Sequence, residues 1–240
     1  MSKDERISTT NDVETQLRNG EMEILGRMPY SSNLTLLVEV TTGDCSIRGI
    51  YKPGQGERPL WDFGDRLYRR EVAAYELSKL LDWNLIPPTV LRDGPLGEGS
   101  VQLFIEADFS EHYFTLYERE ELREQLIRFF IFDVIANNTD RKSGHILIEG
   151  DAKLWGIDNG LTFHEEPKLR TVVWDLGGIP VDTAITEDLE GILDKLDPVF
   201  RPTLSPEEIK ALRRRVKHAK RFREIPDVDP DERAYPWPLV

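Results

Sequence analysis

Two short segments of this 240-residue chain concentrate side chains that could do chemistry. Residues 138–147 read NTDRKSGHIL, and residues 156–163 read GIDNGLTF. Asp140 follows an expected helix, and Asp158 follows an expected hairpin that returns to the same place, so we expect the two carboxylates to converge near His145. One carboxylate of such a group can hold a hard cation such as Mg²⁺, while the other positions a hydroxyl group.

The neighbouring cations allow two interpretations. Arg141 and Lys142 could supply the positive charge that a triphosphate needs in an acidic protein. Alternatively, Asp140 and Arg141 form a structural ion pair, and residues 158–160 are only a turn. Isolated surface ion pairs are common and contribute little to stability. The surrounding elements are therefore needed to choose between the two interpretations.

The elements that position these acids are predicted from apolar periodicity. Apolar side chains recur every three or four residues over 118–136 and predict a helix. Asn137 and Asn138 suit the C-terminal end of that helix, where a left-handed residue is common. Strands over 145–148 and 153–157 would form the hairpin that delivers Asp158.

The first half of the chain predicts a five-stranded antiparallel sheet with one helix. Alternating apolar residues and Gly-rich turns indicate the strands, and an apolar stripe indicates the helix. The expected strands lie around 22–24 and at 34–41, 45–52, 85–91 and 101–105, with a tight turn at 42–44 and the helix at 68–81.

A basic segment stands out near the other end. Ser205, Pro206 and Glu208 form a capping-box pattern that begins a helix, and residues 210–223 contain eight basic residues and no acidic one. This segment could contact a membrane or nucleic acid. Its regular apolar stripe favours a core helix whose exposed basic face rests against an acidic body.

Composition excludes several classes of protein. The chain has 44 acidic and 31 basic residues, a formal net charge of −13, which disfavours a chain-wide nucleic-acid or anionic-membrane binder. No apolar run reaches the ~20 residues of a membrane span, and the opening residues are polar, so we expect neither stable membrane insertion nor a signal peptide. Cys45 is the only cysteine, which excludes an internal disulfide and predicts a reducing, cytoplasmic setting.

The two acidic segments resemble the phosphatidylinositol 3-/4-kinase superfamily, most closely the type II phosphatidylinositol 4-kinases and their bacterial relatives. In those families Asn-Thr-Asp-Arg opens the catalytic loop, as at residues 138–141, and Ile-Asp-Asn-Gly-Leu-Ala-Phe forms the metal site, as at residues 157–163 with threonine for alanine. HipA-type toxin kinases and four-jointed-type secretory kinases are similar at a greater distance. The resemblance extends in element order over about residues 20–225.

This resemblance implies an α+β, bilobal protein-kinase-like fold of the phosphatidylinositol-kinase type. Such a fold has an antiparallel five-stranded N-lobe and a mainly helical C-lobe. The expected organisation is a disordered N-terminus at 1–18, a kinase-like domain at 19–226 (N-lobe about 19–106, C-lobe about 107–226) and a C-terminal tail at 227–240.

The resemblance also implies residue roles. Asp140 and Arg141 would be the catalytic residues, with Asp140 orienting the acceptor hydroxyl or accepting its proton. Asp158 would bind the Mg²⁺ that bridges the ATP phosphates. Lys52, at the end of the third strand, would contact the α- and β-phosphates, and Glu71 would be its carboxylate partner. Taken alone, Lys52 and Glu71 would be ordinary solvated charges.

The resemblance also implies ATP contacts in two further segments. Ser31 and Ser32, with Asn33, lie in the loop between the first two strands and would contact the β- and γ-phosphates. Phe104 and Ile105 would lie at the hinge, where backbone groups meet adenine.

His145 is a departure from the family pattern. It stands where those kinases carry a metal-binding Asn, five residues after the catalytic Asp. A neutral imidazole can ligate a divalent metal but suits Mg²⁺ less well than an amide oxygen. The sequence therefore allows Mn²⁺ preference, a single-metal mechanism, or nucleotide binding without catalysis.

The function that the sequence favours is an ATP-dependent phosphotransferase acting on a protein, lipid or small-molecule hydroxyl. Acidic residues lie after the metal motif, in 164–167. They support a phosphoinositide substrate less well than the rest of the sequence supports ATP binding. The alternatives are a pseudokinase that binds nucleotide as a switch or scaffold, a protein Ser/Thr kinase rather than a lipid kinase, and an unrelated α+β binding protein. We expect no nucleic-acid partner for so acidic a chain.

Overall fold

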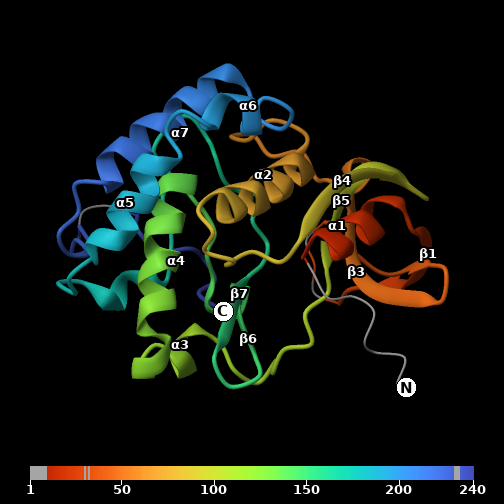
Figure 1. Cartoon of the computed structure of the whole chain (residues 1–240), viewed down its shortest axis with the longest axis horizontal. Coiled ribbons are helices and arrows are strands. Elements are labelled where there is room, and N and C mark those ends of the chain that lie inside the picture. Colours follow the sequence, from red (N-terminus) through yellow and green to blue (C-terminus); the bar gives the residue numbers. More distant parts are fainter. Residues whose placement is uncertain (1–9, 30, 32, 230–232) are drawn as a thin grey trace. The chain divides into compact units, whose positions relative to one another are not determined.

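The computed structural model describes residues 10–29, 31, 33–229 and 233–240. The first elements along the chain are α1 (Thr10–Asn19), β1 (Glu21–Arg27), β2 (Leu36–Thr42), β3 (Cys45–Pro53), the 3₁₀ helix η1 (Gly54–Gly56), α2 (Leu67–Leu80), β4 (Thr89–Gly94) and β5 (Gly97–Leu103). They are followed by α3 (Tyr113–Leu116), η2 (Glu120–Leu122), α4 (Arg123–Ala136), η3 (Ser143–His145), β6 (Ile146–Glu149), β7 (Lys153–Gly156), η4 (Val173–Leu176), α5 (Thr183–Gly191), α6 (Leu196–Phe200) and α7 (Pro206–Ala219) (Figure 1).

The chain divides into two compact units. Unit 1 holds the described residues up to Tyr75 together with Pro87–Ile105. Unit 2 holds Glu76–Ile86 and the described residues from Glu106 onward. The division falls inside α2, so the last turn of that helix belongs to unit 2.

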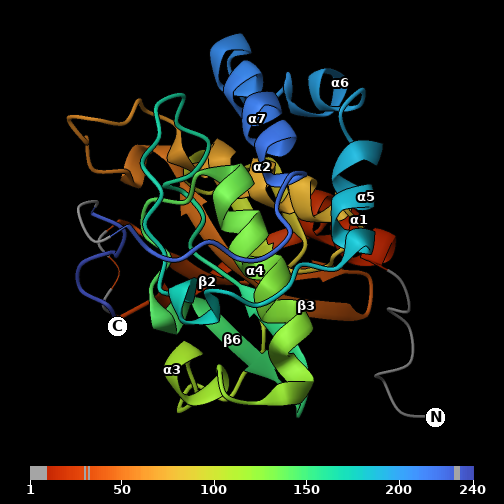
Figure 2. The same cartoon turned by 90° about the vertical axis from the view of Figure 1, so that its left-hand side faces the viewer.

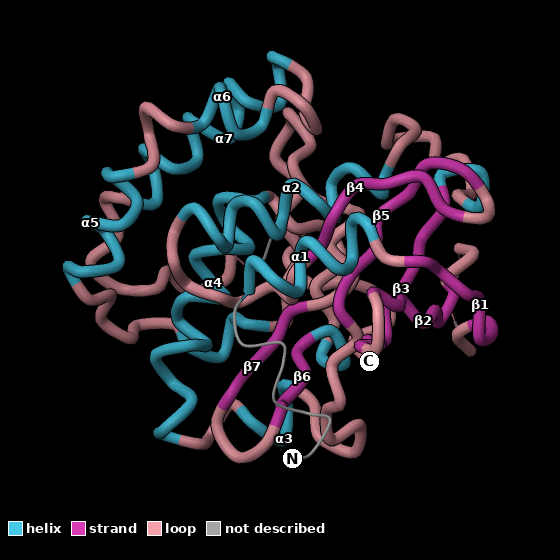
Figure 3. The backbone as a smooth tube through the Cα atoms, turned by 45° about the vertical axis from the view of Figure 1, so that its right-hand side comes forward, coloured by secondary structure: helices cyan, strands magenta, loops and turns pink. Residues whose placement is uncertain are grey.

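Unit 1 is built on one antiparallel sheet in the order β1-β2-β3-β5-β4 (Figure 3). In β2, Leu36, Val38 and Val40 are buried while their neighbours are more exposed, which is the alternation of a strand with one covered face. Thr42 pairs with Cys45 across a two-residue loop, where Gly43 takes a φ of 59°. Glycine adopts that left-handed conformation at little cost, and the expected tight turn is confirmed.

Helix α1 packs on this sheet, against β2, β4 and β5. Leu17 is fully buried in the sheet's core, and the Gln16 side-chain amide donates to the carbonyls of Val40 and Cys45, both at 2.9 Å. We expected residues 1–18 to be disordered, and for residues 10–18 that expectation is wrong. The helix has too few apolar residues for a clear periodic pattern, and tertiary packing stabilises it instead. Residues 1–9 lie outside the described residues.

The last two strands of the sheet lie differently from the expected ranges of 85–91 and 101–105. β4 begins at Thr89 because Pro87 and Pro88 lack the N–H group that a ladder requires. The expected loop at 92–100 is instead a hairpin, in which Gly94 pairs with Gly97. Turn-forming residues obscured this pairing, although the number of strands and their antiparallel sense are as expected.

Unit 2 is mainly helical, with α7 packed against α4, α5 and α6 (Figure 2). The expected capping box is confirmed, because Ser205 accepts from the Glu208 N–H at 3.2 Å and Glu208 accepts from the Ser205 N–H at 2.8 Å. The two-stranded hairpin β6–β7 pairs Ile146 with Gly156 and Glu149 with Lys153. Every helix in the described ranges is too short or too polar to span a bilayer.

The described part of the C-terminal tail packs against other segments of unit 2. The Ala234 carbonyl accepts hydrogen bonds from the Thr171 N–H and the Trp174 indole, both at 3.0 Å. The Leu239 carbonyl accepts from the Ser143 N–H at 2.8 Å. These bonds hold the tail against the start of η3 and against the segment around η4.

Candidate functional site

The loop that carries Asp140 begins where α4 ends. Asn137 takes a left-handed φ of 54° and its N–H bonds to the carbonyls of Asp133 and Val134, which stops the helix as its residue type predicts. The Phe163 N–H then donates to the Ala136 carbonyl at 2.6 Å, and the Thr139 N–H donates to the Leu161 carbonyl at 3.0 Å. The segment that follows Asp158 is thereby fixed to the end of α4.

Asp140 is held in a partly desolvated position. Its N–H donates to the Asn138 side-chain oxygen at 3.0 Å, and its carboxylate accepts from the Lys142 ammonium at 3.1 Å. Burial raises the pKa of Asp140 above its ordinary value; the ammonium of Lys142 opposes this rise, and the negative charge of Asp158 adds to it. The two acids therefore interact electrostatically, as their convergence in the sequence predicted.

Asp158 presents its carboxylate to solvent from a strained backbone. Its φ is 56°, in the left-handed region that non-glycine residues enter at a cost, although Asp tolerates it better than most. Its side chain is 54% exposed, and one oxygen lies 3.5 Å from Nε2 of His145. Backbone strain of this kind is concentrated at functional sites.

The geometry of His145 bears on the expectation that it ligates a metal. The Lys142 N–H points to Nδ1 at 3.4 Å, so Nδ1 is the acceptor and a neutral ring carries its proton on Nε2. Nε2 is the nitrogen that faces Asp158. A protonated nitrogen has no lone pair for a cation, so this arrangement favours a ring that orients Asp158 over a ring that ligates metal.

Arg141 lies in the interior rather than at a phosphate-facing surface. Its side chain has no solvent exposure, and its Nη2 lies 3.0 Å from Oδ1 of the equally buried Asp133. Its Nε bonds to both oxygens of that carboxylate, at 3.1 and 3.2 Å. The expected charge for a triphosphate is thus neutralised internally, and the expected ion pair with Asp140 is replaced by one with α4.

The same guanidinium reaches both neighbours of Asp158. Nη1 donates to the Ile157 carbonyl at 3.0 Å, and Nη2 donates to the Asn159 side-chain oxygen at 2.8 Å. Because Arg141 also follows Asp140 directly, one side chain fixes the loops that carry both acids. The structure therefore assigns Arg141 a positioning contact in place of a contact with ligand.

Sequence reasoning missed the residues that hold Arg141. Asp133 also accepts from the Asn138 amide at 3.1 Å and from the Thr171 hydroxyl at 2.9 Å. One signal was available, because an acid amid the apolar residues of α4 must be paired if the helix is buried. Thr171 carried no such signal, since it comes from a distant loop.

Unit 1 contains the other expected charges. Lys52, in β3, forms an ion pair with Glu71 on α2, whose carboxylate is almost fully buried at 4% exposure. Helix α2 buries residues on nearly all sides, so Glu71 lies in the interior rather than on a solvated face. The pairing fits the resemblance, and the contact of Lys52 with nucleotide stays a prediction.

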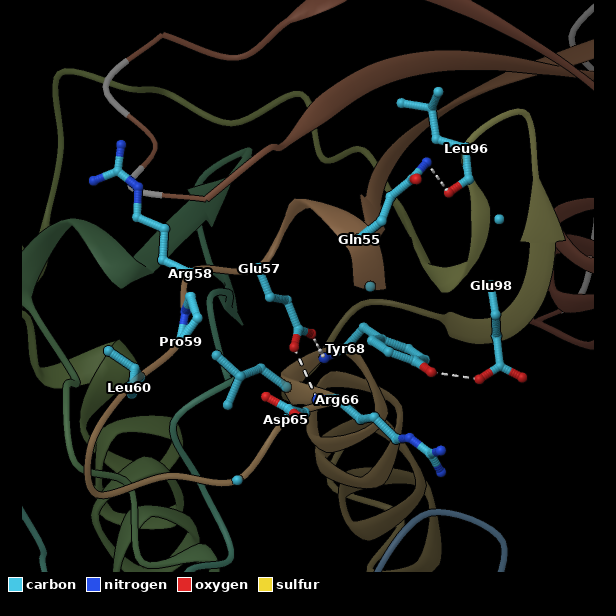
Figure 4. A pocket seen from close by; sticks show the side chains of 14 residues that line it. Gln55, Glu57, Arg58, Pro59, Leu60, Asp65, Arg66, Tyr68, Leu96 and Glu98 are labelled. Carbon is cyan, nitrogen blue, oxygen red and sulfur yellow. Dashed lines mark hydrogen bonds between the residues drawn. The ribbon is translucent and has the colours of Figure 1, made fainter.

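Glu57 fixes the start of α2. Its carboxylate accepts from the backbone N–H groups of Arg66 and Tyr68, at 2.9 and 2.7 Å, as a side chain from outside the helix that caps its N-terminus. Figure 4 shows these bonds in a pocket of about 460 Å³ between the β3–α2 loop and the β4–β5 turn. Among the predicted nucleotide-binding residues that the structure describes, none lines this pocket.

The remaining predicted ATP contacts are Ser31, Ser32, Phe104 and Ile105. Ser31 is half-buried in the β1–β2 connection, and Ser32 lies outside the described residues. The Phe104 N–H donates to the Arg48 carbonyl at 3.0 Å and is therefore engaged in unit 1, while the Ile105 side chain is buried. An adenine contact at this position must use other backbone groups of the segment.

Unit 2 offers few side chains that could bind a metal. No group of three or more His, Cys, Asp or Glu side chains arranged for a metal occurs in the described ranges. A kinase magnesium takes most of its ligands from phosphates and water and needs only one or two carboxylates. The exposed carboxylate of Asp158 fits that requirement.

Comparisons with known proteins bear on the family and on the fold of the chain. No family model matches the chain. The chain is 36% identical to Protein Rv2133c of Mycobacterium tuberculosis (strain ATCC 25618 / H37Rv) over an alignment of 272 residues, which covers 97% of each chain.

Three solved structures share the fold at low identity. A Golgi casein kinase with Mn/ADP bound matches 93% of this chain and 80% of its own, with 13% identity and a TM-score of 0.59. Hydra Fam20, solved with sugar, matches 88% of each chain, with 15% identity and a TM-score of 0.63. The Helicobacter pylori proinflammatory kinase CtkA matches 86% of this chain and 94% of its own, with 11% identity and a TM-score of 0.52. The α+β protein-kinase-like fold with a five-stranded antiparallel sheet is confirmed, and the narrower phosphatidylinositol-kinase resemblance stays a prediction.

Proposed function

The chain belongs to the family of Protein Rv2133c and has a protein-kinase-like fold, and from this premise we propose that it is an ATP-dependent phosphotransferase that phosphorylates a hydroxyl group. The observation that carries the proposal is the arrangement of Asp140 and Asp158. The charges of the two acids interact, and Asp140 directly precedes Arg141, whose buried guanidinium bonds to both neighbours of Asp158. This arrangement suits phosphoryl transfer, which depends on positioning and charge stabilisation.

In the proposed reaction, Asp140 orients the acceptor hydroxyl and accepts its proton. The hydroxyl oxygen forms a bond to the γ-phosphorus as the bond between that phosphorus and the β–γ bridging oxygen breaks, and ADP leaves. A carboxylate whose pKa is raised by burial is a better base than an exposed one. Lys142, paired with Asp140, balances its charge before the acceptor arrives.

Asp158 is the proposed ligand of Mg²⁺ or Mn²⁺, and the metal would neutralise charge on the ATP phosphates. His145 holds the Asp158 carboxylate from one side. In unit 1, Lys52 is the proposed contact for the α- and β-phosphates, and Glu71 keeps its ammonium in place. The Golgi casein kinase crystallised with Mn/ADP supports the choice of nucleotide and metal.

A nucleotide-binding pseudokinase is the second candidate, because His145 stands where the resembled kinases carry a metal-binding Asn. The acceptor class also stays a proposal. A protein hydroxyl is favoured over a phosphoinositide because Glu165 and Glu166 are exposed directly after the Asp158 segment, where an anionic lipid surface would be repelled.

The test is ATP turnover and autophosphorylation with Mg²⁺ and with Mn²⁺. We expect Asp140→Ala to abolish turnover and retain nucleotide binding, and Asp158→Ala to weaken metal-dependent nucleotide binding; Asp151→Ala, an exposed acid, is the matched control. Thermal stabilisation by ATP without turnover in wild type would establish the pseudokinase. Nucleotide affinity and metal dependence that Asp158→Ala leaves unchanged would show that this site is assigned wrongly.

A further inference from the structure

Helix α7 carries a line of positive charge on its outer side. Its inner side buries Ile209, Leu212, Val216 and Ala219. Lys210, Arg214, Lys217 and Arg221 follow one another at spacings of four, three and four residues, which places them along one line of the helix and its final turn. All four are exposed, and we refer to them as the basic stripe.

The other cations of α7 serve to anchor the helix. Arg213 pairs with Asp197, and Lys220 pairs with Glu190. Arg215 donates to the carbonyls of Ile135 and His164 at 2.7 and 3.0 Å, and its burial lowers its pKa to about 10. These contacts bind α7 to α4, α5 and α6 and leave the basic stripe outside.

The side chains of the basic stripe differ from these anchoring cations. In the described part of the chain, none of its four side chains forms an ion pair, and Arg214 reaches only the Glu165 carbonyl, at 3.5 Å. Exposed charges are usually solvated, so this alone indicates no function. The distribution of acidic residues around the basic stripe is more informative.

Acidic residues flank the basic stripe on both sides. Glu190 of α5 and Asp197 of α6 lie along one side, as their pairs with α7 show. Glu165 and Glu166 are exposed on the other side, in the segment to which Arg214 and Arg215 bond. A planar anionic membrane would meet these acids as well as the cations, and a duplex nucleic acid would spread its phosphates over them. A narrow anionic chain would meet the cations alone.

The length of the basic stripe determines the length of the anionic chain that could bind along it. From Lys210 to Arg221 the helix rises about 17 Å at 1.5 Å per residue. An extended peptide covers this distance with about five residues. We propose that the basic stripe docks an extended acidic segment, about five residues long, of a partner protein.

The probe for this proposal is a short fluorescein-labelled oligoglutamate peptide, measured by fluorescence anisotropy with the full chain at low and at high salt. The stripe variant is Lys210→Glu/Lys217→Glu/Arg221→Glu. The control variant, Arg18→Glu/Arg123→Glu/Arg201→Glu, reverses three exposed arginines elsewhere and has the same net charge. Far-UV circular dichroism and melting temperature establish that both variants fold.

We expect wild type to bind the peptide more weakly as salt rises, because salt screens exposed charges. The stripe variant should bind about tenfold more weakly or worse, and the control variant within about twofold of wild type. No binding by wild type, or an equal loss in both variants, would overturn the proposal. So would stronger stripe-dependent binding of phosphatidylserine vesicles or of single-stranded DNA, since either would identify a different class of partner. The readout is binding alone and does not depend on phosphotransferase activity.

Discussion

Arg141 and Asp133 form an ion pair in which neither side chain has any solvent exposure, with Nη2 3.0 Å from Oδ1. A carboxylate and a guanidinium lose their hydration when they are buried, and only a complete set of hydrogen bonds compensates for that loss. Here Asp133 also accepts from Asn138 and Thr171, and Arg141 also donates to the Ile157 carbonyl. The pair anchors the candidate catalytic loops because both of its side chains also have other hydrogen-bond partners.

Removing one member of this pair should be costly. Arg141→Ala leaves the Asp133 carboxylate buried and uncompensated, and we expect the free energy of unfolding to fall by about 3–5 kcal/mol. Urea denaturation followed by circular dichroism measures the change. Arg123→Ala, which removes an exposed pair with Glu120, should cost less than about 1 kcal/mol. A loss in Arg141→Ala no larger than in this control would contradict the prediction.

Asp140 should reduce stability at neutral pH. Its pKa is raised in the folded chain, so the folded state binds more protons than the unfolded state from the ordinary value of 3.8 up to the folded pKa. Stability contributed by this group is therefore lost as pH rises through that interval, and the charged form is a net cost at pH 7. Asp140→Asn removes the charge and should raise the melting temperature by about 2–4 °C at pH 7.

The same comparison at pH 4 identifies the cause. Because the pKa of Asp140 is raised, a larger fraction of its carboxylate is protonated at pH 4 than at pH 7, so the advantage of Asp140→Asn should shrink. Asp151→Asn, at an exposed position, should show neither effect. An advantage of Asp140→Asn that is independent of pH would mean that packing rather than charge is responsible.

Lys52→Met should affect both stability and nucleotide binding. It removes the ammonium that pairs with the Glu71 carboxylate, which is 4% exposed, and we expect a loss of about 1–3 kcal/mol in the free energy of unfolding. Thermal stabilisation by ATP should disappear, whereas Lys52→Arg, which keeps a cation at this position, should retain part of it. Lys79→Met, an exposed lysine on the same helix, is the control. If Lys52→Met keeps full ATP stabilisation, Lys52 is not a phosphate contact.

His145→Asn tests whether the imidazole orients Asp158 or ligates metal. An orienting ring implies that turnover falls by a similar factor with Mg²⁺ and with Mn²⁺, since Asp158 loses its neighbour in both cases. A ligating ring implies a selective effect, because an amide oxygen suits Mg²⁺ better than an imidazole nitrogen. The ratio of the two rates in variant and wild type separates these outcomes, and a gain in activity with Mg²⁺ alone would refute the orienting role.

The sequence predicted elements best where one residue type dictates the backbone. Asn137 ends α4, Gly43 forms the first hairpin turn, and Ser205 caps α7, each for a local reason. Prediction from the sequence failed where tertiary contacts determine the local structure. Helix α1 depends on a side-chain amide bonded to two strands, and the β4–β5 hairpin forms through residues that resemble a loop.

The same distinction applies to the candidate site. The convergence of Asp140 and Asp158 followed from a helix end and a hairpin, both readable in one stretch of sequence. The burial of Arg141 did not, because its partner Asp133 comes from α4 and is itself bonded to Thr171 of a distant loop. No local pattern distinguishes an arginine that faces a ligand from one that supports a loop.

The division of the chain has a consequence for its synthesis and for fragment design. The chain passes between the units after Tyr75, Ile86 and Ile105, so cutting any one of these three connections leaves the units covalently joined. A ribosome completes unit 1 only with Ile105, after it has already made the segment from Glu76 to Ile86. Residues 76–86 can complete their contacts only after the β6–β7 hairpin has been made, because the Gly156 N–H of that hairpin bonds to the Leu85 carbonyl at 2.7 Å. Neither unit can therefore be produced as one uninterrupted fragment, and a fragment of unit 1 alone requires a linker in place of residues 76–86.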